Sequence, residues 1–205
     1  MTDDDRPLPT AELTSKNLLI QSLPQETPLF RIHSTIHSPV FFGQQLPHRF
    51  DAPKQYGVMY VGIDEHAAFR ETFFHGEIDN LRIDSGKYQR LETSSISRLS
   101  VNRELRLVKA YDNGLKWNGI NDRISSEVDR QYTQKWSLAY WQHRDRVDGI
   151  IFRSRHDKDR LCVALYSDRV DGIISVRSAE RLLDQSFQDM LGKIIDDYQV
   201  EIVSA

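Results

Sequence analysis

Short runs of apolar residues, some alternating with polar ones, predict several β-strands along this chain. Residues 29–33 alternate between apolar and polar from Phe30 onward, which predicts a strand with Arg31 on the face opposite to Phe30 and Ile32. Four further runs bounded by turn residues have the length and composition of strands. They cover Val58–Ile63, Leu105–Lys109, Val147–Arg153 and Leu161–Tyr166.

Other segments repeat their apolar residues at the three- and four-residue spacing of an amphipathic helix. These segments are Ala11–Leu23, which Pro24 would end, then Glu65–His75, Ile120–Arg144 and Ala179–Tyr198. Asp64 is a good N-cap for the second of them, and Gly76 is a good C-terminal stop. A last short strand is expected at Val200–Val203.

Strands dominate the middle of the chain and helices lie between and after them, so the pattern predicts an α+β fold. Residues 1–10 are acidic and carry two prolines, which favours a mobile N-terminal tail. We therefore expect residues 1–24 to form a tail with a short helix, and residues 25–205 to form a single domain.

Composition narrows the class of protein. The 205 residues are 39% hydrophobic and 28% charged with a net charge of −3, so no basic field argues for nucleic-acid binding. The single cysteine, Cys162, lies in an apolar run and excludes a disulfide framework or a multi-cysteine metal site. The seven histidines show no metal-binding spacing, so no metal is expected.

No apolar run is long enough to span a membrane, and the acidic start lacks the pattern of a secretion signal, so we expect a cytoplasmic protein.

Five residues carry the candidate chemistry: Arg31, Arg49, Tyr60, Glu71 and Ser154. Two arginines suit a diphosphate, and a tyrosine suits an aromatic ring. Glu71 falls on the helix face of small and aromatic residues that should point inward, which is how catalytic carboxylates are often held. Each residue also has an ordinary structural interpretation, such as a surface ion pair for Arg31, a solvated loop charge for Arg49, a core tyrosine for Tyr60 or a loop cap for Ser154.

In their order along the chain, the segments that carry these residues resemble the RES-domain family, which is named for arginine, glutamate and serine. The matching stretches are Leu29–Ile32, His48–Phe50, Val58–Val61, Ala67–Glu71, Asp148–Ser154 and Val163–Tyr166. The resemblance implies a compact fold like that of ADP-ribosyltransferases, with a mixed, mostly antiparallel β core flanked by helices. It extends over about residues 28–170, with a closing helix at about 179–198.

The resemblance also implies an enzyme that cleaves the nicotinamide–ribose bond of NAD by hydrolysis or by phosphorolysis. Arg31 and Arg49 would then hold the diphosphate, Tyr60 would contact the nicotinamide and Ser154 would hydrogen-bond the substrate. Glu71 would be catalytic, by stabilising the oxocarbenium-like ribose, by gripping its hydroxyls or by orienting the attacking group. NAD would be a substrate, no cofactor is implied, and phosphate is a candidate co-substrate.

Members of this family are mostly toxins of toxin–antitoxin pairs, so the resemblance implies an Xre-type protein antitoxin as partner. Two other functions stay open. The chain could be an ADP-ribosyltransferase acting on a macromolecule, although the place two residues before Glu71, where such enzymes often carry an acceptor-positioning acid, holds Phe69. It could also be a non-catalytic NAD-binding module. The sequence leaves the oligomeric state open, a homodimer included.

Overall fold

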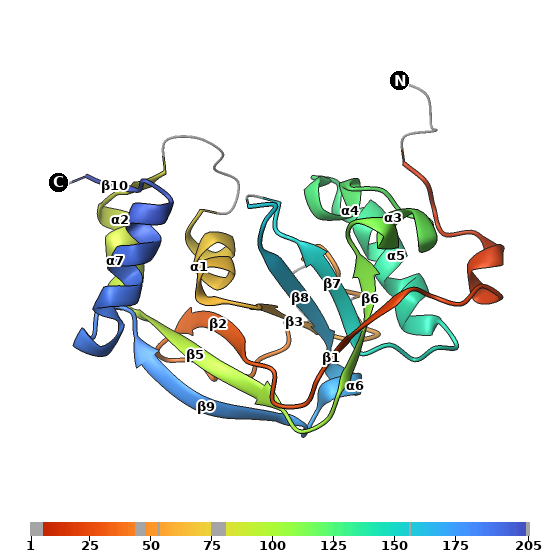
Figure 1. The fold of residues 1–205 in the computed structure, drawn as a ribbon, viewed down its shortest axis with the longest axis horizontal. Helices are drawn as coiled ribbons and strands as arrows, with labels where there is room; N and C mark the ends of the chain where they lie inside the picture. The colour runs from red at the N-terminus through yellow and green to blue at the C-terminus, as the bar shows by residue number, and fades with distance from the viewer. Residues whose placement is uncertain (1–5, 44–47, 53, 75–80, 156, 204–205) are drawn as a thin grey trace.

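The computed structural model describes residues 6–43, 48–52, 54–74, 81–155 and 157–203. Its centre is one strongly curved sheet in the order β1-β6-β7-β8-β3-β2-β5-β9, shown in Figure 1. These strands are β1 Ile20–Leu23, β2 Leu29–Ser34, β3 Val58–Gly62, β5 Ser94–Val101, β6 Leu105–Ala110, β7 Gly149–Arg153, β8 Leu161–Tyr166 and β9 Ile174–Arg181. Only β6 and β7 pair in parallel within this sheet, so it is mostly antiparallel as expected.

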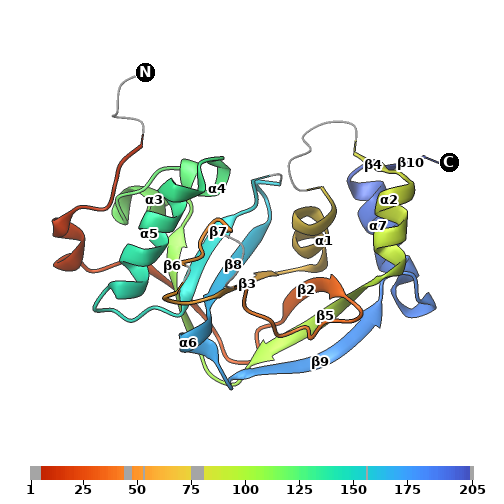
Figure 2. The ribbon, with the colours of Figure 1, turned by 180° about the vertical axis from the view of Figure 1, so that it is seen from behind.

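Helices stand at both ends of the sheet. The α-helices are α1 Glu65–Phe73, α2 Ser85–Glu92, α3 Asn113–Trp117, α4 Arg123–Ser126, α5 Arg130–Gln142, α6 Ser167–Val170 and α7 Gln188–Asp197. Figures 1 and 2 show α2 and α7 at one end, α3, α4 and α5 at the other, and α1 between the two groups. A small parallel pair, β4 Arg82–Ile83 with β10 Glu201–Ile202, lies beside α2 and α7.

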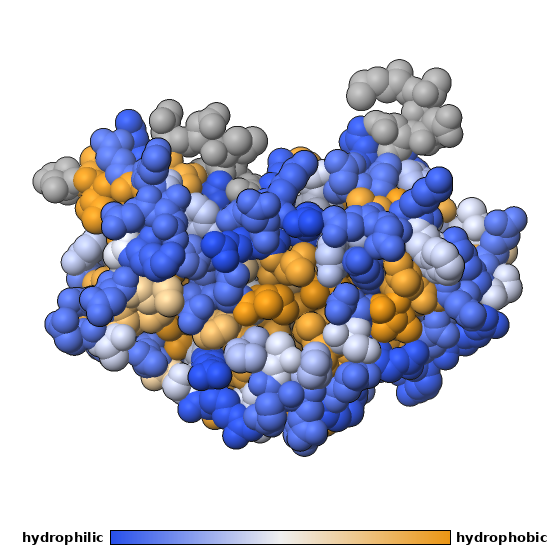
Figure 3. Space-filling view, in the orientation of Figure 1, coloured by the Kyte–Doolittle hydropathy of each residue, from blue (hydrophilic) through white to orange (hydrophobic). Residues whose placement is uncertain are grey.

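Three buried clusters stabilise this arrangement. One lies under α5 and includes Trp136 and Tyr140, and another packs α1 against α7 around Phe69. The third fills the inside of the curved sheet around Leu99 and Leu107. Burial of each large apolar side chain contributes roughly 1.5–3 kcal/mol. On the face drawn in Figure 3, apolar side chains also reach the surface in the middle of the molecule and beside β6.

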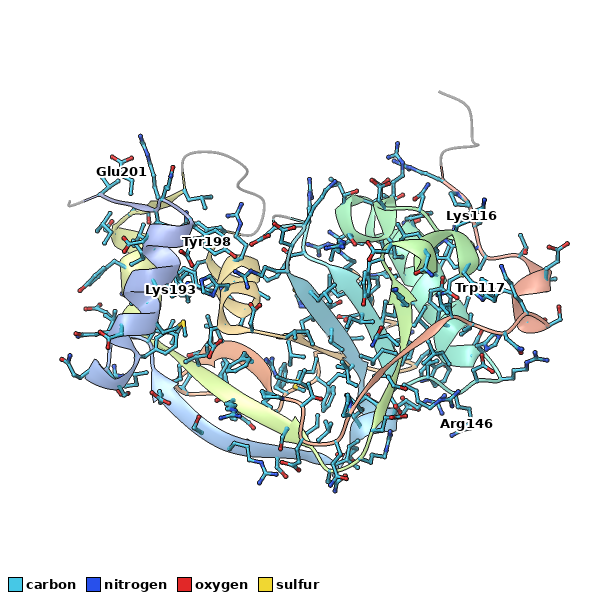
Figure 4. All side chains as sticks on the ribbon, in the orientation of Figure 1. Lys116, Trp117, Arg146, Lys193, Tyr198 and Glu201 are labelled. Carbon is cyan, nitrogen blue, oxygen red and sulfur yellow. The ribbon has the colours of Figure 1, made fainter. Side chains whose placement is uncertain are left out.

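Helix α7 holds α1 and the loop after β7 in place. Figure 4 shows Lys193 and Tyr198 on and just after this helix, on the side of α1. Between them Asp197 accepts hydrogen bonds from Lys193 and from His66 of α1, at 2.8 and 2.9 Å. The Tyr198 hydroxyl donates to Asp157 at 2.6 Å. One helix end therefore fixes both α1 and the segment that follows β7.

The expected strands at residues 29–33, 58–63, 105–109, 147–153 and 161–166 are confirmed, with small shifts at their ends. The expected helix at Ala11–Leu23 is wrong. Only Ala11–Thr14 is helical, as a short 3-10 turn, and Ile20–Leu23 is β1. The reason is pairing with β6, which places Ile20 opposite Val108 and supplies backbone hydrogen bonds that local periodicity does not reveal.

The closing helix was expected at Ala179–Tyr198, but it begins later in the chain. Residues up to Arg181 belong to β9, which pairs along β5, and α7 begins only at Gln188. A 3-10 turn at Gln185–Phe187 separates the two. The expected last strand is shorter than predicted, at Glu201–Ile202.

The expected long helix at Ile120–Arg144 is two helices, α4 and α5. The break lies at residues 127–129, where Glu127 Oε1 accepts from the backbone N–H groups of Val128 and Asp129 at 2.9 and 3.1 Å. The side chain of Asp129 then caps α5 by accepting from Gln131 N at 3.0 Å. Helix α1 starts at its expected cap, Asp64, which accepts from Ala67 N at 2.7 Å. Its expected stop, Gly76, lies outside the described residues.

Candidate functional site

A cavity of about 540 Å³ opens between α1, strands β2 and β3, residues 48–49, and residues 127–130 at the start of α5. Four of the five predicted residues line it: Arg31, Arg49, Tyr60 and Glu71. Their positions in the sequence are far apart, and the antiparallel pairing of β2 with β3 and the turn from β3 into α1 bring them together. The fifth residue, Ser154, contacts Glu71.

Glu71 projects from α1 into the cavity, on the same helix face as Ala67 and Ala68, which also line it. The turn before the helix is tight, because a Cβ atom on Gly62 would lie 2.6 Å from the backbone nitrogen of Ala68. This close approach sets where α1 leaves the sheet, and therefore where the carboxylate stands.

Ser154 follows β7 and is 1% exposed. Its Oγ donates a hydrogen bond of 2.5 Å to Oε1 of Glu71, and its backbone N–H donates to Arg160 O at 2.9 Å. A hydroxyl so placed fixes one oxygen of the carboxylate. The predicted contact of Ser154 with substrate stays a prediction.

Arg31 is held by the loop that follows β2. One of its guanidinium nitrogens, Nη1, donates to the carbonyl oxygens of Pro39 and Phe41 at 2.8 and 2.9 Å. Burial lowers the pKa of Arg31 to about 10, so the side chain stays protonated near pH 7. Arg31 lines the cavity, where its fixed positive charge suits an anionic ligand.

Arg49 also lines the cavity and lies next to residues 124–127. Its Nη1 donates to the carbonyl oxygen of Glu127 at 2.9 Å. Burial lowers the pKa of Arg49, and the positive charges of Arg155 and Arg130 lower it further, whereas Tyr60 and Glu71 raise it. An anion bound in the cavity would relieve this repulsion between like charges.

Tyr60 uses its hydroxyl within the protein. The phenol oxygen accepts from Phe50 N at 2.8 Å, and the ring stacks on Phe50 with centroids 6.3 Å apart. Burial raises the pKa of Tyr60 well above its usual value, so the hydroxyl stays protonated. The ring lines the cavity, and its predicted contact with nicotinamide stays a prediction.

The sequence reasoning missed several lining residues. Among the described residues, Arg90, Arg130 and Arg155 bring the arginines that line the cavity to five, against two glutamates, Glu71 and Glu127. Arg155 directly follows Ser154 in the sequence, and its position next to a predicted site residue is the signal that could have identified it. Arg90 comes from α2, an element that the pattern did not predict, and Arg130 begins α5, where charged residues are common. No local pattern marks either of them.

Cys162 also lines the cavity, opposite Gly62 on the paired strands β8 and β3. It is 3% exposed, and burial raises the pKa of its thiol well above the usual value. A thiolate nucleophile is therefore disfavoured at this position. Within the described residues, no group of histidine, cysteine and acidic side chains could hold a metal ion, and no helix has the length and apolarity to cross a membrane.

Known proteins resemble this chain in sequence or in fold. The family model described as the RES domain matches residues 28–185. The protein named "Probable toxin y4kH" from Sinorhizobium fredii (strain NBRC 101917 / NGR234) is 31% identical over 113 residues, which are 55% of this chain and 86% of that protein. A chain in the crystal structure of the M. tuberculosis MbcT-MbcA toxin-antitoxin complex superposes with a TM-score of 0.62. The match covers 83% of this chain and 92% of that one, and at 14% identity it is a likeness of fold.

Proposed function

The chain belongs to the RES domain family, and from this premise we propose that it is a toxin that cleaves the nicotinamide–ribose bond of NAD. The observation that carries the proposal is a carboxylate, Glu71, held by Ser154 at the wall of a cavity lined by arginines. The expected partner is a separate protein antitoxin of Xre type. This expectation is supported by the likeness to a chain of a toxin-antitoxin complex and to a probable toxin.

The cavity has the size and charge for a dinucleotide. Its volume of about 540 Å³ falls within the range of roughly 300–1,000 Å³ that ligand sites occupy. Arginine binds phosphate oxygens through two parallel hydrogen bonds, and five arginines line this cavity in the described part of the chain. A ligand with a diphosphate would balance the excess of positive charge.

Glu71 would act on the ribose. Breaking the bond to nicotinamide leaves positive charge on the sugar, and a fixed carboxylate stabilises that charge as it develops. In the same position it could instead grip the ribose hydroxyls or orient the attacking group. Water as the attacking group makes the enzyme a glycohydrolase, and inorganic phosphate makes it a phosphorylase.

Transfer of ADP-ribose to a macromolecule is the alternative reaction of the same pocket. The residue two positions before Glu71, Phe69, is fully buried in the cluster between α1 and α7 and has no acid to offer an acceptor. This favours a small acceptor. A non-catalytic NAD-binding module is the other alternative, and the same assay tests it.

The test is NAD loss and nicotinamide release by the purified chain, with and without phosphate. We expect cleavage by the wild type and a loss of at least about a hundredfold in kcat for Glu71→Gln, as for removal of one preorganised electrostatic group. Glu65→Gln is the matched control, because Glu65 lies on the same helix but not on the cavity wall. Wild-type protein that binds NAD without cleaving it would establish a binding module, and ADP-ribose found attached to protein would establish a transferase.

A further inference from the structure

The loop that carries Arg49 is held along its backbone by one face of helix α5. Three successive carbonyl groups of this loop accept hydrogen bonds from side chains of the helix. Gln134 Nε2 donates to His48 O at 2.8 Å, Thr133 Oγ1 donates to Arg49 O at 2.5 Å and Ser137 Oγ donates to Phe50 O at 2.7 Å.

The spacing of the three donors explains why they meet one extended segment. Positions 133, 134 and 137 are separated by one and by three residues, so they share one face of the helix. Thr133 and Ser137 are both fully buried. A hydroxyl inside a helix commonly bonds a carbonyl of its own preceding turn. Thr133 also lies 3.0 Å from Arg130 O, but its shorter contact is the one to the loop.

The other side of the loop is fixed as well. The backbone N–H of Phe50 donates to the Tyr60 hydroxyl at 2.8 Å, and that of His48 donates to Asp51 Oδ2 at 3.1 Å. From this clamp the Arg49 side chain lines the cavity together with His48, and Arg49 Nη1 donates to Glu127 O. The guanidinium therefore starts from a backbone with little freedom.

We infer that Thr133, Gln134 and Ser137 are positioning residues that hold Arg49 in place for the diphosphate of the substrate. The inference rests on the proposed function for the identity of the ligand. Holding Arg49 in advance removes the cost of ordering its loop when the ligand binds. A residue that grips the substrate equally before and during reaction changes KM more than kcat.

The main test is the kinetics of Thr133→Val, which keeps the shape of the side chain and removes its donor. We expect KM for NAD to rise about tenfold with kcat changed less than about threefold, since one hydrogen bond contributes about a factor of ten. Thr133→Ser should restore KM. Ser100→Ala is the control, because Ser100 is also buried, accepts a hydrogen bond from Arg177 Nε and does not line the cavity.

A second arm separates positioning from a general loss of structure. In an Arg49→Ala background the effect of Thr133→Val on KM should disappear, because the substitution acts through Arg49. An undiminished effect in that background, or a KM unchanged by Thr133→Val in the wild type, would overturn the inference.

A third arm needs no NAD. Hydrogen–deuterium exchange of the free protein should become faster over residues 48–52 in Thr133→Val and stay unchanged in Ser100→Ala. Wild-type protein that neither binds nor cleaves NAD would remove the proposed function, and faster exchange at residues 48–52 would still support the clamp on Arg49. Unchanged exchange there would overturn the clamp whatever the substrate.

Discussion

Ser154 Oγ donates to Oε1 of Glu71 at 2.5 Å, which joins the end of β7 to helix α1. Of the predicted site residues, Ser154 and Glu71 therefore touch, and Arg31 lines the same cavity as Glu71. The pair is 83 residues apart in sequence. The short contact fixes the rotamer of the carboxylate before any ligand arrives.

We predict that Ser154→Ala lowers kcat for NAD cleavage about 10- to 100-fold and changes KM little. A hydrogen bond to a charged group contributes about 1.5–3 kcal/mol, and 1.36 kcal/mol is a factor of ten in rate. Steady-state kinetics check this, with Ser100→Ala as the control for loss of a buried hydroxyl. A change confined to KM would instead assign Ser154 to substrate binding.

Arg155 should contribute to binding, although it was not among the five residues expected from sequence. We predict that Arg155→Ala raises KM for NAD about tenfold and makes KM less dependent on salt, because a charge that faces the phosphates is lost. Arg153→Ala is the matched control. Arg153 lies two residues away, pairs with Asp112 at 2.9 Å and does not line the cavity. Equal effects of the two substitutions would show that Arg155 has no specific role.

Asp51 should make stability depend on pH. Burial raises the pKa of this fully buried carboxyl, more than the hydrogen bond from His48 N lowers it. In the unfolded chain this carboxyl ionises at about pH 3.9, whereas in the folded protein it ionises only at a higher pH. The folding stability therefore falls as the pH rises from about 3.9 to the raised pKa of the folded state. Asp51→Asn removes the ionisation and still offers an acceptor to His48.

We therefore expect Asp51→Asn to unfold at a higher temperature than the wild type near pH 7 and at a similar temperature near pH 4. Thermal unfolding at a series of pH values measures the difference. The exposed Asp171, changed to Asn, is the control and should shift the curve little at any pH. A difference between Asp51→Asn and wild type that grows as the pH falls would contradict the sign of this effect.

The sequence could predict β2, β3, β6, β7, β8 and α1 because their signals are local. Apolar runs mark Val58–Gly62 and Leu161–Tyr166, and the cap at Asp64 marks the start of α1. The sequence could not predict β1 or the start of α7. At Ile20–Leu23 and at residues 179–181 of β9, pairing with distant strands decides the conformation and overrides the helical spacing.

The same distinction between local signals and long-range contacts applies to the candidate site. Glu71 could be predicted as a site residue because the residue spacing placed it on the inward face of its helix. Arg31 could be predicted because apolar and polar residues alternate along its strand. The family pattern supplied Arg49, Tyr60 and Ser154, but their partners were out of reach. The contact of Thr133 with Arg49 spans 84 residues and depends on the break between α4 and α5, which periodicity did not show.

Gly62 should be the most sensitive glycine near the site, because its missing side chain lets α1 approach β3. A Cβ atom there would lie 2.6 Å from Ala68 N and 2.7 Å from Asp64 O, both backbone atoms that cannot turn aside. We predict that Gly62→Ala destabilises the protein by about 1–3 kcal/mol, which lowers Tm by roughly 2–12 °C. It should also lower kcat, because the displaced helix carries Glu71.

Gly192→Ala is the matched control, in the middle of the last helix, where an added Cβ meets nothing within 4 Å. Alanine favours a helix over glycine by about 1 kcal/mol, so Tm should rise by roughly 2–4 °C with kcat unchanged. Calorimetry and the NAD assay on the two variants separate a specific effect on α1 from a general effect on stability. A Gly62→Ala variant as stable and as active as the wild type would show that the carboxylate does not depend on this close approach.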